Sequence, residues 1–116
     1  MFKLWFLAAA AAMMLSAPVF GHAKLRATVP AADAQLQAAP KTLSLSFNED
    51  VHLALVTLTG AGKDIPLTVD RAAPASSQVS IVLPPLPAGK YQVQWSAISA
   101  DDGHVTKGTF SFTVLT

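Results

Sequence analysis

The chain has 116 residues, of which 52% are hydrophobic and 13% are charged, and it contains no cysteine. A chain of this length forms at most one small domain, and without cysteine no disulfide can stabilise it. The formal net charge of +1 excludes the strongly basic surface on which binding to nucleic acids depends.

The first 21 residues have the composition of a secretory signal peptide. Lys3 gives a positive start, residues 4–15 form an apolar segment, and residues 16–21 include small and helix-breaking residues. The apolar segment is too short to span a membrane as a helix, so we expect cleavage after Gly21. Residues 1–21 are then the leader, and residues 22–116 are the mature domain, with no membrane span. Because the exported chain has no cysteine, we expect it in the bacterial periplasm.

Along the mature domain, apolar and polar residues alternate with the period of two that is typical of β-strands. The pattern predicts strands over residues 25–29, 42–47, 51–59, 65–69, 78–83, 91–97 and 109–114. Turn residues separate them: Gly60-Ala61-Gly62 predicts a hairpin, and residues 72–77 have the composition of a loose loop. Seven short strands with turns at this spacing predict an all-β fold, a small seven-stranded Greek-key sandwich or barrel. The expected core includes Phe47, Trp95, Phe110 and Phe112.

His22 is one of three histidines, and cleavage after Gly21 makes it the first residue of the mature chain. An N-terminal histidine offers its α-amine and its ring nitrogen to the same metal ion. The amine has a pKa of roughly 7.7 to 8.0, so a metal displaces a loosely held proton. Cleavage after Ala23 would instead discard His22, but Phe20 fits poorly three positions before that cut.

A second candidate ligand pair, Asp102 and His104, stands in the turn before residues 109–114. Residues two apart in extended backbone point to the same side, and Gly103 lets the chain bend so that both side chains converge. The neighbouring Asp101 leaves open which carboxylate is the ligand. Taken alone, the motif is more typical of a plain hairpin turn, and only together with His22 does it favour a metal site.

Together, His22, Asp102 and His104 offer three nitrogens and one oxygen. This set favours Cu(II), whereas Cu(I) prefers thiolate or thioether, and all three methionines lie in the leader. We therefore predict one Cu(II) ion per mature chain.

Four segments, in their order and spacing, resemble the CopC family of periplasmic copper-resistance proteins. They are residues 22–25, 46–49, 87–95 and 99–112. The resemblance implies an immunoglobulin-like or cupredoxin-like β-fold that binds Cu(II) through His22, Asp102 and His104. It also places Glu49, the glutamate of the family's Phe-x-Glu motif, near the metal, where it would hydrogen-bond to a ligand; the simpler interpretation is a surface acid. The absence of methionine from the mature chain resembles the family's single-site members.

The function implied by this resemblance is a non-enzymatic Cu(II) carrier or buffer in copper homeostasis and resistance, delivering copper to a CopD-like inner-membrane partner. We expect a monomer with no nucleic-acid partner. One alternative is a copper oxidase that uses a histidine brace; it requires an aromatic substrate face, yet Tyr91 and Trp95 fit the core better. The other is an adhesive sandwich domain without metal. His52 is expected to be structural or exposed, not a ligand.

Overall fold

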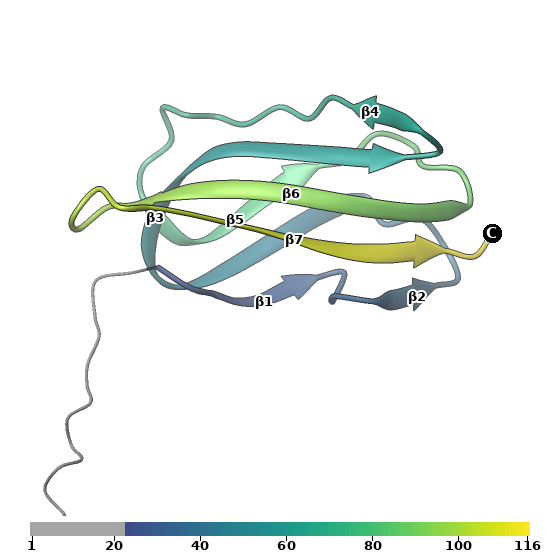
Figure 1. Ribbon diagram of the computed structural model, residues 1–116, viewed down its shortest axis with the longest axis horizontal. Coiled ribbons are helices and arrows are strands. Elements are labelled where there is room, and N and C mark those ends of the chain that lie inside the picture. Colours follow the sequence, from purple (N-terminus) through teal and green to yellow (C-terminus); the bar gives the residue numbers. More distant parts are fainter. Residues whose placement is uncertain (1–22) are drawn as a thin grey trace, which may run out of the picture.

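The computed structural model describes residues 23–116, and within this range every regular element is a strand (Figure 1). The strands are β1 (Leu25–Val29), β2 (Ala34–Leu36), β3 (Thr42–Gly60), β4 (Lys63–Ile65), β5 (Ser76–Val82), β6 (Gly89–Ser99) and β7 (Val105–Val114). No helix in residues 23–116 has the length and hydropathy that crossing a membrane requires. The all-β, seven-stranded prediction is confirmed.

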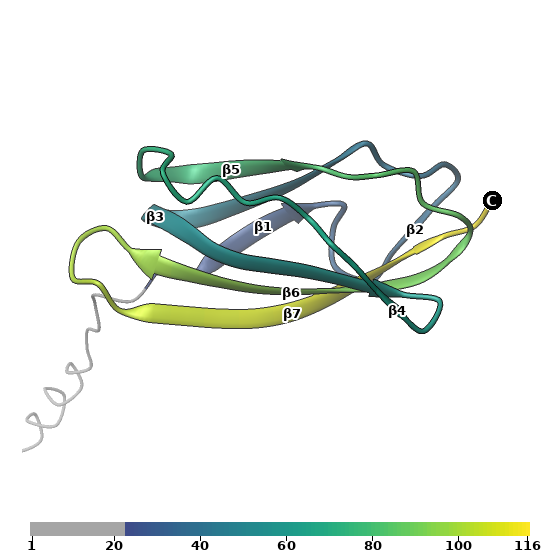
Figure 2. The ribbon, with the colours of Figure 1, turned by 90° about the horizontal axis from the view of Figure 1, so that it is seen from above.

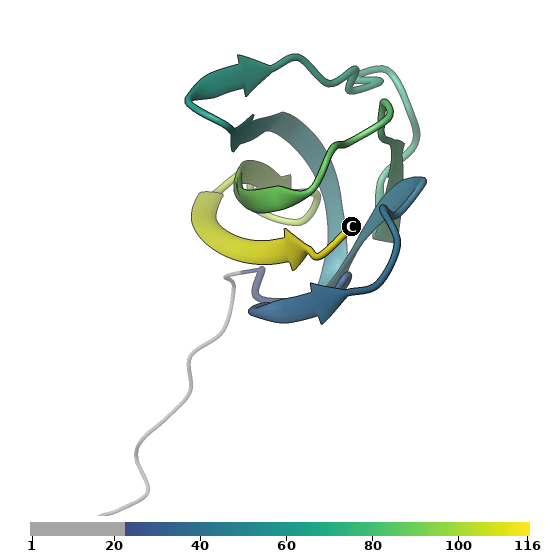
Figure 3. The same ribbon diagram turned by 90° about the vertical axis from the view of Figure 1, so that its right-hand side faces the viewer.

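Strand β3 organises the fold because it belongs to both layers of the molecule. Its first part pairs with β1 and β5, and its second part pairs with β4 and β6. The remaining strands continue the second layer in the order β6, β7, β2. The pairing shifts between Ser46 and Val51, where β3 turns the corner from one layer to the other. Figure 2 shows β1 and β5 on one side with β6 and β7 on the other, and Figure 3 shows the sheet curling around the core.

The structure differs from the sequence predictions at four places. The segments predicted as separate strands over residues 42–47 and 51–59 form the single strand β3. Of the strand predicted over residues 65–69, only Ile65 lies in a strand, at the end of β4, because Pro66 follows it and has no N–H for the ladder. Strand β2 has only three residues and was not predicted, while β5 begins at Ser76, inside the predicted loop.

The core lies between the layers and contains the predicted aromatic residues. Phe47, Trp95, Phe110 and Phe112 are all buried, and so is Tyr91. The rings of Phe47 and Trp95 meet edge to face, with centroids 5.3 Å apart. Inward residues therefore follow the alternation seen in the sequence.

One end of the sandwich gathers three segments that are far apart in the sequence. They are the start of β1, the corner of β3 and the turn between β6 and β7 (Figure 1). Backbone hydrogen bonds join them: Asn48 N–H donates to the Lys24 carbonyl at 3.0 Å, and Ala100 N–H donates to the Asp50 carbonyl at 3.0 Å. Two of the candidate ligands, Asp102 and His104, belong to the β6–β7 turn and therefore lie at this end.

Candidate metal centre

The turn between β6 and β7 is closed by its own backbone. Ser99 N–H donates to the His104 carbonyl at 2.9 Å, and Gly103 N–H donates to the Ser99 carbonyl at 3.0 Å. Gly103 has a φ of +74°, a left-handed conformation that residues with a Cβ rarely adopt. The predicted role of Gly103 in bending the chain is confirmed.

The structure brings Asp102 and His104 into direct contact. Asp102 Oδ2 lies 2.8 Å from His104 Nδ1, and Asp102 Oδ1 accepts the His104 backbone N–H at 3.1 Å. An ionised carboxylate only accepts hydrogen bonds, so Nδ1 carries the hydrogen of this contact. A metal ion that binds both side chains would take the place of this hydrogen, between Asp102 Oδ2 and His104 Nδ1. The side chains are 58% exposed for His104 and 35% exposed for Asp102, so an ion can approach from solvent.

The hydrogen bond from the His104 side chain holds the pKa of Asp102 below its ordinary value, and the backbone hydrogen bond from His104 acts in the same direction. Asp102 is therefore a carboxylate throughout the neutral pH range. Its negative charge favours a cation beside the His104 ring.

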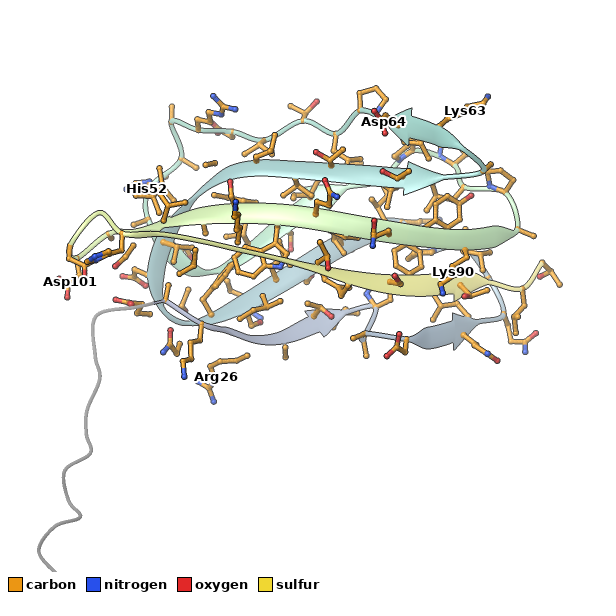
Figure 4. The ribbon with its side chains drawn as sticks, viewed as in Figure 1. Arg26, His52, Lys63, Asp64, Lys90 and Asp101 are labelled. Atoms are coloured by element: carbon orange, nitrogen blue, oxygen red, sulfur yellow. The ribbon has the colours of Figure 1, made fainter. Side chains whose placement is uncertain are left out.

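The neighbouring Asp101 is oriented differently from Asp102. Asp101 contributes its backbone N–H, which donates to Ser99 Oγ at 3.2 Å, and the residue is exposed at the end of the turn (Figure 4). The contact with His104 is made by Asp102. This difference favours Asp102 over Asp101 as the carboxylate that acts together with His104.

Glu49 lies half-buried at the corner of β3 and accepts a hydrogen bond from Ser99 Oγ at 3.3 Å. Ser99 is only 2% exposed, at the end of the inward row of β6. The sequence reasoning gave Ser99 no role. The signal was present, however, because Ser99 is a polar residue in a row whose preceding members, Tyr91 to Ala97, are apolar and buried.

The start of β1 is attached to the same corner. Asn48 Oδ1 accepts the Lys24 backbone N–H at 2.7 Å, in addition to the backbone bond between these residues, and Ala23 is 2% exposed. His22, the predicted first residue of the mature chain, lies outside the described residues. The binding of one metal ion by the α-amine and the ring of His22 therefore stays a prediction.

His52 is exposed on β3, opposite Ile98 of β6, as its position in the alternation predicts. Figure 4 shows it on a different side of this end from Asp101. Among residues 23–116, no three His, Asp or Glu side chains are grouped so that they could hold a metal ion. The Asp102–His104 pair offers an imidazole nitrogen and a carboxylate oxygen, donors that suit a copper ion.

A family model described as the CopC domain matches residues 25–115 of the chain. Among curated proteins, Copper resistance protein C of Escherichia coli is 35% identical over 104 residues, covering 80% of this chain and 81% of the relative. Copper resistance protein C of Xanthomonas campestris pv. juglandis is 34% identical, covering 90% of this chain and 88% of the relative.

Two solved structures are similar over most of the chain. CopC from Methylosinus trichosporium OB3b has a TM-score of 0.66 and 27% identity, covering 81% of this chain and 94% of that one. PcoC from Escherichia coli, a methionine-rich copper resistance protein, has a TM-score of 0.64 and 33% identity, covering 81% and 99%. The strand arrangement, the matched domain and these relatives agree, and the chain belongs to the CopC family.

Proposed function

We propose that the mature chain, beginning at His22, binds one Cu(II) ion and serves copper homeostasis and resistance in the periplasm. The observation that carries this proposal is the contact between Asp102 and His104 on an exposed turn. The names of the relatives, which are copper resistance proteins, supply the identity of the metal.

In the proposed site, His22 contributes its amine and imidazole, His104 contributes its ring nitrogen Nδ1, and Asp102 contributes a carboxylate oxygen. Three nitrogens and one oxygen suit the tetragonal geometry of Cu(II). Residues 22–116 contain neither cysteine nor methionine, so no soft ligand is available to favour Cu(I). The chain differs in this respect from PcoC, which is described as methionine rich.

A carrier or buffer is the role that this geometry supports best. Four donors fill the positions that Cu(II) binds most strongly, and two of these donors lie on a solvent-exposed turn, where another protein can take over the metal. We propose that this acceptor is a CopD-like inner-membrane protein. The mature chain acts as a monomer in this scheme, and copper is its cargo.

The alternative, a copper oxidase, requires an aromatic surface that binds substrate beside the metal. Tyr91 is 2% exposed and Trp95 is 6% exposed, so neither offers such a surface. Ascorbate-driven peroxide formation by the copper-loaded protein separates the two functions. If the protein is a carrier, it should form peroxide no faster than a matched copper–peptide control. Sustained peroxide formation above the rate of that control would favour the oxidase.

Intact mass spectrometry of the exported protein tests the proposal. The expected mass is that of residues 22–116, and one equivalent of copper should add one copper ion per chain in native spectra. A chain that begins at another residue, or that remains copper-free in the titration, would contradict the proposed site.

A further inference from the structure

The corner of β3 contacts both segments from which the proposed copper site is built. Asn48 holds the start of β1, since its Oδ1 accepts the Lys24 N–H at 2.7 Å and its own N–H donates to the Lys24 carbonyl at 3.0 Å. The next residue, Glu49, accepts the hydrogen bond of Ser99 Oγ at 3.3 Å. Two adjacent residues therefore link the beginning of the mature domain to the base of the β6–β7 turn.

Ser99 is the residue through which the turn is attached. Its Oγ donates to Glu49 and accepts the Asp101 N–H, while its backbone groups pair with His104 and Gly103. The residue is 2% exposed. Removing the hydroxyl would leave the Asp101 N–H and the Glu49 carboxylate without these contacts, which water replaces incompletely at a buried position.

We propose that Asn48 and Ser99 are positioning residues of the copper site. Asn48 fixes the start of β1, Ser99 fixes the β6–β7 turn, and the corner of β3 joins these two segments. This inference rests on the proposed function, because His22 is a ligand only there. Neither residue donates an atom to the metal. Their effect is to set the distance between the two groups of ligands before copper arrives.

The physical reason is the cost of ordering. If the chain start and the turn moved independently, copper binding would have to order both, and the lost conformational freedom would weaken the affinity. The hydrogen bonds of Asn48 and Ser99 already form when the chain folds. The loss of conformational freedom therefore accompanies folding and does not weaken copper binding. Groups hydrogen-bonded to metal ligands typically contribute about 10- to 100-fold in metal affinity, and we expect the same range for contacts that fix the segments carrying the ligands.

The test compares Asn48→Ala and Ser99→Ala with the conservative variants Asn48→Asp and Ser99→Thr, all in the mature protein. Competition with a chromophoric chelator gives the Cu(II) dissociation constant, and electron paramagnetic resonance reports the geometry around the bound ion. The matched control is Ser44→Ala, which likewise removes a serine hydroxyl with a side-chain hydrogen bond, to Ser80 Oγ at 3.3 Å, but between β3 and β5, away from the turn.

We expect both alanine variants to bind Cu(II) about 10- to 100-fold more weakly, with altered spectra. Asn48→Asp, Ser99→Thr and Ser44→Ala should retain the parent affinity and spectrum. A purely structural role would lower the melting temperature of the alanine variants and leave the copper spectrum unchanged, which would overturn the inference. Unchanged affinities would also overturn it, while a parent protein that binds no Cu(II) would overturn the proposed function itself.

Discussion

At the scale of single residues, Asp102 and His104 show how local sequence determines a geometry. Two residues separated by one glycine form a side-chain contact of 2.8 Å and a backbone contact of 3.1 Å. Both contacts are local, and the spacing in the sequence, taken together with His22, was enough to single out the pair. The difference between Asp101 and Asp102 could not be predicted in this way, because it depends on which carboxylate the folded turn directs toward the ring.

The two aspartates give the first prediction. Asp102→Asn should weaken Cu(II) binding markedly, because it removes the charge beside His104, whereas Asp101→Asn should change the affinity little. Isothermal titration calorimetry with a competing chelator measures both constants. Equal losses would show that the carboxylate has been misassigned.

The pKa of Asp102 gives a second prediction, on pH dependence. Its pKa is lowered from the ordinary value of 3.8, so the carboxylate stays charged as the pH falls from 8 to about 5. Imidazole and amine ligands, in contrast, must lose protons to bind copper, so affinity should fall continuously over that interval. The parent and Asp102→Asn should therefore show parallel pH profiles in chelator competition; profiles that converge near pH 5 would mean that Asp102 itself takes up a proton there.

At the scale of elements, the corner of β3 explains both the success and the failure of the strand predictions. Inward residues continue through the corner, with Phe47 and Val51 both buried, although the polar residues between them imitate a turn. A strand that changes layers keeps its backbone extended, so only tertiary structure distinguishes it from a hairpin. Strand β2 was not predicted for a related reason. It has only three residues, and it is a strand because it pairs in parallel with β7, which lies far away in the sequence.

The end of β3 gives the third prediction. A Cβ at Gly60 would overlap the ring of Tyr91, which is 2% exposed and whose hydroxyl donates to the Pro87 carbonyl, so the ring cannot move aside easily. Gly60→Ala should therefore lower the free energy of unfolding by about 1–3 kcal/mol, as overpacking generally does.

Chemical denaturation of Gly60→Ala measures this loss, with Thr59→Ala as the control on the neighbouring residue. The control should lose less, because the Thr59 hydroxyl makes only a 3.4 Å contact with Asp64. Wild-type stability of Gly60→Ala would contradict the packing described around Tyr91.

At the scale of the whole molecule, the sandwich brings the chain start and the β6–β7 turn to one end. The sequence predicted the fold class, most strands and the aromatic core, because period-two alternation reports burial directly. It did not predict the links through Asn48 and Ser99. The Ser99–Glu49 bond joins residues 50 positions apart, and no local pattern encodes such a contact.

The central claim is that the amine of His22 and the β6–β7 turn bind one cupric ion together. The most direct measurement is the Cu(II) dissociation constant of the mature chain beside three variants: one extra residue before His22, His104→Ala, and His52→Ala as the control. The extension turns the amine into an amide, so it and His104→Ala should each weaken binding by orders of magnitude while His52→Ala binds as the parent does. An extended chain that binds Cu(II) as tightly as the mature one would contradict the account.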